Sequence, residues 1–380
     1  MPTIVSAKPK AYLKVRHKAV RAAMKELNLD GLLLTHPPDL HYLTNFTGDD
    51  SVGLITHKDF FLVTDFRYKE QASMEAGWLK TSLREAKMSD ALAKVLKENP
   101  MKRVGFEANF TTVGQIDAIL NSIKANKDGQ AAPELVPLEN VMLALRKVKD
   151  DHEIDLIRKA VAVAEEAFVA IKSEIKPGQT ENYLAGLLIL ELRSRGASGT
   201  SFSPIVATGA NSSLPHYRPS DDKTEIEKDQ PCLFDWGAVL NGYCSDLTRT
   251  FMIGHVPHKV REIYKVVYDA QLAAIKFLRP GVTTVQADRV ARDVIEDAGF
   301  GKQFGHGLGH GIGREIHELP SLRKTGGEEE LRPGMILTIE PGIYLPGVGG
   351  VRIEDDVLIT HSGCEVLSTL DKTLEGNHIE

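Results

Sequence analysis

Residues 234–251 of the chain, FDWGAVLNGYCSDLTRTF, decide the fold that we expect for its last third. Asn241 and Gly242 stand between two apolar runs, and an Asn-Gly pair in that position is a strong signal for a tight β-hairpin. The hairpin would place Asp235 and Asp246 on its two arms. Apolar residues flank Asp235, and a carboxylate in such a strand is costly to bury unless it is paired or binds a metal.

Each of these acids also has a plainer explanation. Asp235 could be an exposed residue of an amphipathic strand, and Asp246 could form a salt bridge with Arg249. Taken as a pair across one tight turn, the two carboxylates indicate a cation site.

Three further segments carry candidate ligands, namely His310 in GHGLGHGIGREIHE (305–318), Glu340 in LTIEPGIY (337–344) and Glu354 in GVRIEDD (350–356). Glu340 ends an apolar run that should form a buried strand, so its charge needs a cation. The four negative charges of the carboxylates, with a neutral imidazole, cancel the four positive charges of two divalent cations. Ligation by many oxygens and one nitrogen suits Mn²⁺, Co²⁺ or Zn²⁺. Because a metal pair about 3.5–4 Å apart can ionise a bridging water, the sequence predicts a dinuclear metallohydrolase.

Glycines and histidines dominate the segment 305–318, which holds His306, His310 and His317. The plain alternative is a flexible turn. Against it, glycines let the backbone approach closely, and three imidazoles add groups that titrate near neutral pH. The segment matches neither glycine-rich phosphate-binding pattern. No H-E-x-x-H occurs in the chain, which excludes a mononuclear zinc protease of that type.

An internal repeat supports the same site. AIKSEIKPGQT (170–180) matches AIKFLRPGVTT (274–284) with a one-residue gap, and in both a helix ends at Pro-Gly and a Thr can cap the next helix. Each half then supplies a histidine, His216 or His317, and a hairpin with two acids. Two such halves would pack about a local two-fold axis with four acids at the centre. Both histidines become candidates for proton transfer or carbonyl binding.

A charged stretch divides the chain into an α/β domain, residues 1–147, and a second domain, residues 148–380. In the first domain, apolar spacing predicts a helix over 12–28, a buried strand from Gly31 and a hairpin with its turn near 57–59. We find no plausible catalytic cluster in this domain.

The second domain should open with a long amphipathic helix that begins near Asp151. Asp150 or Asp151 is its expected cap, and Glu153 lies in its first turn, where an acid is favourable.

The composition excludes several classes of protein. A length of 380 residues fits two domains, and 42% hydrophobic with 26% charged residues is typical of a globular protein. A net charge of −6 without a basic block argues against nucleic acid as a partner. No apolar stretch is long enough for a membrane span, and the N-terminal residues lack the apolar core of a secretory signal. Three cysteines, an odd number, indicate a reducing compartment, so we expect the cytoplasm.

The four segments 234–251, 305–318, 331–344 and 350–360 together resemble the pita-bread-fold metallopeptidases. That family includes prolidase, aminopeptidase P, methionine aminopeptidase and, as a metal-free relative, creatinase. The first domain resembles the creatinase-type domain of the proline-directed branch, which methionine aminopeptidases usually lack. The resemblance implies an α/β N-terminal domain, an α+β pita-bread catalytic domain with an internal pseudo-two-fold repeat, and a homodimer.

The resemblance also implies a role for each candidate ligand. Asp235 and Asp246 would bind one metal ion. His310 and Glu340 would complete the other, and both Asp246 and Glu354 would bridge the pair. Mn²⁺ is the expected ion, with Co²⁺ and Zn²⁺ as alternatives. All five ligand types are present in this chain, and this distinguishes it from creatinase, which does not keep the metal ligands.

The implied reaction is hydrolysis of the peptide bond between an N-terminal residue and proline, by attack of a metal-bridging hydroxide on the carbonyl. His216 and His317 would bind and polarise that carbonyl. His306 would line the pocket for the residue after the cut bond, and Arg352 matches an active-site arginine. Proline-containing peptides are the implied substrates.

Two other functions stay open, namely a non-catalytic peptide-binding or scaffold protein on the same fold and a metal-free, creatinase-like C–N hydrolase. Within the peptidase interpretation, the sequence favours neither a dipeptidase nor an aminopeptidase. A dipeptidase must bind the free carboxylate of Xaa-Pro. Arg323 or Lys324 could do so, or both could be solvated surface charges.

Overall fold

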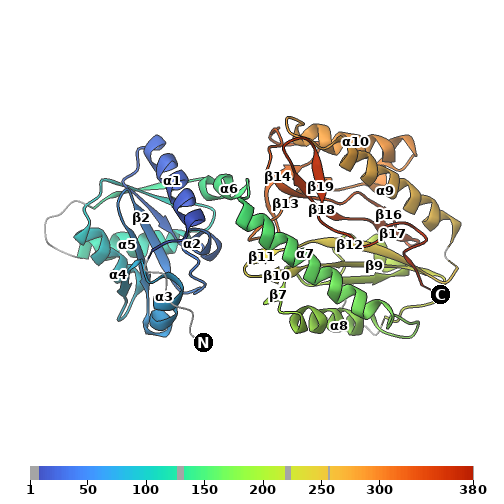
Figure 1. Cartoon of the computed structure of the whole chain (residues 1–380), viewed down its shortest axis with the longest axis horizontal. Helices are drawn as coiled ribbons and strands as arrows, with labels where there is room; N and C mark the ends of the chain where they lie inside the picture. The colour runs from blue at the N-terminus through green and yellow to red at the C-terminus, as the bar shows by residue number, and fades with distance from the viewer. Residues whose placement is uncertain (1–7, 126–131, 219–223, 256, 380) are drawn as a thin grey trace. The chain divides into compact units, whose positions relative to one another are not determined.

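The computed structural model describes residues 8–125, 132–218, 224–255 and 257–379. The chain divides into two compact units, Met1–Arg146 and Lys147–Glu380, and the boundary expected from the sequence lies one residue away (Figure 1). Within the described part, no helix has both the length and the apolar character needed to cross a membrane.

The first unit is built on a mixed six-stranded sheet in the order β4-β3-β2-β1-β5-β6. Its strands are β1 (Gly31–Leu34), β2 (Val52–Thr56), β3 (Phe60–Thr64), β4 (Lys80–Leu83), β5 (Arg103–Glu107) and β6 (Glu134–Leu138). Its helices are α1 (Ala11–Glu26), α2 (Pro37–Thr44), the 3₁₀ turn η1 (Phe66–Tyr68), α3 (Lys69–Ala76), α4 (Met88–Glu98), α5 (Val113–Ala125) and α6 (Val141–Arg146).

Strand β1 shows why this sheet has helices on both faces. Leu32 and Leu34 belong to a core shared with α1 and α2, whereas Leu33 belongs to a second core shared with α4 and α5. Successive strand residues point to opposite faces, so a strand buried on both faces is continuously apolar. The predicted helix, the strand from Gly31 and the hairpin turn near residues 57–59 are all confirmed.

The second unit contains two similar halves. The first comprises α7 (Asp151–Lys172), α8 (Glu181–Ser194), β7 (Gly199–Thr200), β8 (Ile205–Thr208), η2 (Gly209–Ser213), β9 (Gln230–Trp236), β10 (Ala238–Leu240), β11 (Tyr243–Cys244) and β12 (Leu247–Ile253). The second comprises α9 (His258–Phe277), α10 (Thr284–Asp297), η3 (Gly301–Gln303), β13 (Gly309–Gly311), β14 (Glu318–Leu322), β15 (Ile336–Ile339), β16 (Gly342–Leu345), β17 (Gly349–Arg352), β18 (Asp355–Ile359), β19 (Cys364–Val366) and β20 (His378–Ile379). In Figure 1, α8 and α10 lie at opposite ends of this unit with strands between them.

The helix starts agree with the sequence analysis. Asp150 caps α7 by accepting from Glu153 N at 3.0 Å, and the Glu153 carboxylate accepts from Asp150 N at 3.2 Å, which completes a capping box. The repeated threonines are the caps of the two following helices. Thr180 accepts from Tyr183 N at the start of α8, and Thr283 forms a capping box with Gln286 at the start of α10.

The two halves meet along a seam between β12 and the chain joining β17 to β18. Thr248 and Glu354 form an isolated antiparallel bridge there. Thr250 Oγ1 donates to Arg352 O at 3.0 Å and accepts from Arg352 N at 3.2 Å. The seam therefore brings the acid-bearing strands of both halves side by side.

The hairpin expected at 241–242 is present. Asn241 and Gly242 both have positive φ, 51° and 75°, and they join β10 to β11, where Leu240 pairs with Tyr243. Positive φ at both central positions is the turn geometry that Asn-Gly favours.

Candidate metal centre

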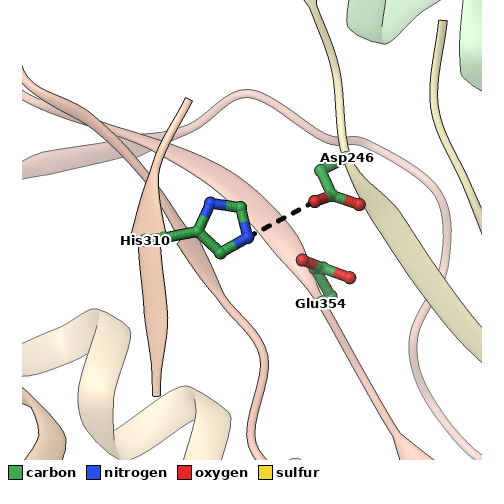
Figure 2. A group of neighbouring side chains, drawn as sticks. All are labelled: Asp246, His310 and Glu354. Carbon is green, nitrogen blue, oxygen red and sulfur yellow. Dashed lines mark ion pairs between the residues drawn. The ribbon is translucent and has the colours of Figure 1, made fainter. Parts of the chain in front are cut away.

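The core of the candidate site is formed by Asp246, His310 and Glu354. Asp246 precedes β12, His310 lies in β13, and Glu354 lies between β17 and β18. Their donor atoms all lie within 4.8 Å of one another, and Figure 2 shows the three side chains pointing toward a common centre. His310 Nε2 is 3.6 Å from Asp246 Oδ2. Three predicted ligands from distant segments are therefore gathered at one point.

Glu340 joins this group from the end of β15. Its Oε1 lies 3.5 Å from His310 Nε2. Thr338 holds the two residues together, because its hydroxyl donates to Glu340 Oε1 at 3.2 Å and accepts from His310 N at 3.0 Å. The structure thus brings together the two side chains that were expected to share an ion.

Asp235 approaches from β9. Its Oδ2 accepts a hydrogen bond of 2.5 Å from Arg352 Nη2, while its Oδ1 is buried without a hydrogen-bond partner in the described residues. The charge of Asp235 helps to raise the pKa of Asp246 and Glu354, so it lies near the other acids. A buried carboxylate oxygen with no donor of its own is suited to a cation.

The buried acids destabilise one another when ionised. Burial, followed by the charges of Glu354 and Asp235, raises the pKa of Asp246 well above its usual range. Burial, followed by Glu340 and Asp235, does the same for the pKa of Glu354. Burial raises the pKa of Glu340 to about 7, although Arg352 opposes the shift. These carboxylates need a cation to be charged at neutral pH.

His310 is prepared to bind a cation through Nε2. Its Nδ1 lies 3.0 Å from Gly311 O, and a carbonyl can only accept, so we assign the ring proton to Nδ1. Burial, with a smaller effect of His317, lowers the pKa of His310 to about 4. A neutral imidazole whose second nitrogen is anchored is the usual form of a metal-binding histidine. The donor set and its surroundings therefore fit divalent metal ions.

The two histidines expected to act on the carbonyl lie beside this group. The ring centroids of His310 and His317 are 4.4 Å apart in an edge-to-face arrangement. His216 lies in the loop after η2. Burial raises the pKa of Asp235, and a positive charge on His216 opposes that shift. The same charge adds to the lowering of the pKa of His317. Burial is the largest cause of the lowered pKa of His317.

The loop that carries His216 is held by a buried acid of α8. Glu181 Oε1 accepts from Thr208 N at 2.7 Å, and Glu181 Oε2 accepts from the Tyr217 hydroxyl at 2.6 Å. Asn211 Nδ2 donates to both carboxylate oxygens. His216 therefore projects from a loop that is fixed on either side.

A hydrogen-bonded chain links the expected pocket residue to the acids. His306 Nε2 lies 2.9 Å from the hydroxyl of Tyr344, which also accepts from Arg352 Nη1 at 2.9 Å. Arg352 in turn donates to Asp235. Burial lowers the pKa of His306 to about 4, so the neutral ring can accept from Tyr344. Arg352 also reaches the carbonyl of Pro215, beside His216, at 3.4 Å.

Two residues that the sequence analysis missed belong to this network. Thr248 lies two positions after Asp246, and Tyr344 lies four positions after Glu340. Even spacing along a strand places side chains on the same face, so the spacing from Asp246 into β12 could have identified Thr248. Tyr344 lies in β16, in another sheet than the strand that ends before Glu340, and no such spacing points to it.

The simple alternative for Asp246 is wrong. Arg249 donates to Asp355 Oδ1 at 2.7 Å, and both side chains are buried. Lys372 also contacts Asp355, and Gln271 donates to it at 2.9 Å. Asp355 therefore points away from the acids and is a structural residue.

Comparison with known proteins extends the resemblance to both units. The model of metallopeptidase family M24 matches residues 155–361, and that of the creatinase/prolidase N-terminal domain matches residues 16–148. The chain is 38% identical over 355 residues to the protein named "Uncharacterized peptidase YqhT" of Bacillus subtilis, covering 93% of this chain and 98% of that protein.

Solved structures agree with this result. The Xaa-Pro dipeptidase from Bacillus anthracis has a TM-score of 0.90 and 39% identity, covering 95% of this chain and 99% of that one. The X-Pro aminopeptidase from Thermotoga maritima MSB8 has a TM-score of 0.84 and 33% identity, covering 92% and 99%. The expected fold, an α/β domain followed by a pita-bread domain, is confirmed.

Proposed function

Because the chain belongs to metallopeptidase family M24, we propose that it hydrolyses the peptide bond between an N-terminal residue and proline at a two-ion centre. The ligands in this proposal are Asp235, Asp246, His310, Glu340 and Glu354. The observation that carries it is the convergence of a neutral imidazole and buried carboxylates from both halves of the second unit.

The side chains around the centre have separate tasks in this proposal. Two divalent ions held there would supply the Lewis acidity that ionises a water near neutral pH. His216 and His317 would donate hydrogen bonds to the carbonyl oxygen as its negative charge grows. Arg352 keeps Asp235 oriented through their hydrogen bond. Tyr344 fixes the ring of His306, which would line the pocket for proline.

The length of the substrate divides the proposal into two forms. The likeness to a dipeptidase supports cleavage of free Xaa-Pro, and the likeness to an aminopeptidase supports cleavage of longer peptides. Of the two candidate carboxylate ligands we choose Arg323, because its Cβ lies 3.1 Å from where a Cβ on Gly307, next to His306, would stand. Its guanidinium packs against Gly326 and would have to turn toward the substrate. We therefore give the dipeptidase form precedence and Arg323 the role of binding the substrate carboxylate.

The test compares matched substrates on one preparation. Metal is removed by chelation, and Mn²⁺, Co²⁺ or Zn²⁺ is added back before an Xaa-Pro dipeptide and an Xaa-Pro-Xaa tripeptide are offered. The proposal expects about two ions per chain, best activity with Mn²⁺, and faster cleavage of the dipeptide. Loss of dipeptide cleavage with retained tripeptide cleavage in Arg323→Ala would support its carboxylate-binding role.

Other outcomes lead to the alternatives. Full turnover in metal-depleted protein would favour the creatinase-like C–N hydrolase, and peptide binding without metal or hydrolysis would favour the scaffold protein. We also propose a homodimer, which light scattering after size-exclusion chromatography would test by giving twice the mass of the chain.

A further inference from the structure

His317 and Glu318 are adjacent in the chain but face different surroundings. The ring of His317 lies against His310, with centroids 4.4 Å apart. The side chain of Glu318 is instead 1% exposed and contacts Lys149. Neighbouring residues at the start of a strand point to opposite sides, so the backbone that places Glu318 on one side places His317 on the other.

The carboxylate of Glu318 folds back over the loop that carries His317. Glu318 Oε1 accepts from Arg314 N at 2.9 Å and from Glu315 N at 3.2 Å. A Cβ added to Gly313 would lie 2.6 Å from Glu318 Oε2, so this acid packs directly on the loop backbone. The loop is closed at its base, where Gly311 pairs with Glu318. The Glu318 carboxylate thus holds the backbone of this loop, which is also fixed where Cys244 N donates to Gly313 O at 2.7 Å.

Lys149 connects this loop to the rest of the second unit. Its Nζ lies 3.2 Å from Glu318 Oε2, and both side chains are 1% exposed. Its backbone N donates to Gly334 O at 2.8 Å, just before β15, the strand that leads to Glu340. Lys149 also directly precedes the capping residue of α7. The ion pair is therefore anchored at fixed elements of the unit.

A buried ion pair needs a reason beyond stability. Removing two charges from water is costly, and apolar residues of similar volume often stabilise a fold as well or better. We propose that the Lys149–Glu318 ion pair is a positioning device that holds the His317 imidazole where it meets the scissile carbonyl. The inference rests on the proposed function, because it assigns His317 to that carbonyl.

The main experiment is a double-mutant cycle on kcat with an Xaa-Pro dipeptide, using Glu318→Gln and His317→Ala. Displacement of a catalytic group by about 1 Å can lower a rate about 10²-fold, so Glu318→Gln should lower kcat by roughly that factor and change KM little. In the His317→Ala background, Glu318→Gln should cause no further loss. Full additivity of the two losses would overturn the proposal.

Replacing both charged residues of the ion pair by neutral ones distinguishes an effect on the position of His317 from an effect on stability. Lys149→Met alone leaves a lone buried carboxylate and should lower Tm. Lys149→Met combined with Glu318→Gln removes both charges while the amide oxygen still serves the loop, so Tm should recover while kcat stays low. Recovery of kcat together with Tm would count against a positioning role. Ile171→Ala, a buried apolar change at the far end of α7, is the matched control and should lower Tm without lowering kcat.

A spectroscopic measurement keeps this inference distinct from the proposed function. In ¹⁵N-histidine-labelled protein, the ring signals of His317, assigned by their loss in His317→Ala, should shift in the neutral-pair variant. They should not shift in Ile171→Ala. If no Xaa-Pro peptide is cleaved but these signals move, the peptidase assignment fails and the coupling of Glu318 to His317 stands. Unmoved signals would refute the coupling even in an active enzyme.

Discussion

Thr248 Oγ1 donates a 2.5 Å hydrogen bond to Glu354 Oε2 and so joins a strand of the first half to an acid of the second. The same hydroxyl accepts from Arg352 Nε at 3.1 Å. Thr248 is therefore shared between a candidate metal ligand and the arginine that orients Asp235. One uncharged side chain fixes the position of acids on both sides of the seam.

Replacing Thr248 by Val should weaken metal binding. The change keeps the shape but leaves Glu354 without its donor, and removing such a partner typically costs 10–100-fold in metal affinity. Titration of metal-free protein with Mn²⁺ would measure the loss. Thr250→Val is the control, because among the described residues the hydroxyl of Thr250 bonds to the backbone of Arg352 in the same seam and to no acid. Equal affinities of the two variants would contradict the role of Thr248.

Metal binding should release protons, and the number released should fall as pH rises. Without a cation, burial raises the pKa of Glu340 to about 7 and holds the pKa of Asp246 and Glu354 above their usual range. A cation favours the ionised acids, so it displaces the protons that these groups carry at pH 6. Calorimetric titration in two buffers of different ionisation enthalpy would count the protons. No release at pH 6 would contradict the prediction.

The raised pKa of Glu340 predicts how the stability of metal-free protein depends on pH. The folded state keeps a proton on Glu340 up to about pH 7, whereas the unfolded chain releases it near its ordinary value of about 4.3. The folded state binds more protons in this window, so the free energy of unfolding should fall as pH rises from about 5 to about 7. Thermal melts of chelated protein should show the decline, and saturating metal should remove it.

Gly237 should tolerate no side chain. A Cβ at this position, between β9 and β10, would lie 1.9 Å from the backbone oxygen of Ser245, which no rotamer change can relieve. Gly237→Ala should therefore lower the free energy of unfolding by about 3 kcal/mol or more and reduce metal content, because it displaces the hairpin arm that carries Asp235. Gly186→Ala, in the open on α8, is the control and should stabilise by up to about 1 kcal/mol.

His17 should make the protein less stable in acid. Burial lowers the pKa of His17, whose Nε2 lies 2.6 Å from Leu43 O. As pH falls, His17 takes up a proton in the unfolded chain at a higher pH than in the folded protein. The stability contributed by neutral His17 is therefore present above about pH 6.5 and is lost as pH falls below it. His17→Gln keeps a donor for Leu43 without the titrating ring. Urea unfolding at pH 5 and pH 7.5 should differ less in this variant than in the unmodified protein.

The sequence predicted the elements well, and it named acids that the structure brings close together, because both depend on local patterns. Strand periodicity and the Asn241–Gly242 turn identify the first acid hairpin, and the repeat of Pro-Gly-x-Thr identifies the helix starts. Local spacing suggested a salt bridge between Asp246 and Arg249, which is wrong because a distant acid, Asp355, competes for the arginine.

The supporting contacts could not be predicted in this way. Lys149 and Glu318 are 169 positions apart, and Glu181 and Tyr217 are 36 apart. Nothing in the local sequence of either partner specifies the other, since such pairs depend on the packing of whole elements. The sequence therefore indicates which groups carry the chemistry, and the fold shows what keeps them in place.

The seam between the two halves links the stability of the protein to the concentration of metal around it. A cation bound at the proposed centre would be held by residues of both halves, and it would bind the folded protein but not the unfolded one. Such a ligand adds stability by mass action, in proportion to the logarithm of its free concentration. If the proposal holds, a shortage of metal would lower the thermal stability of the protein as well as its activity.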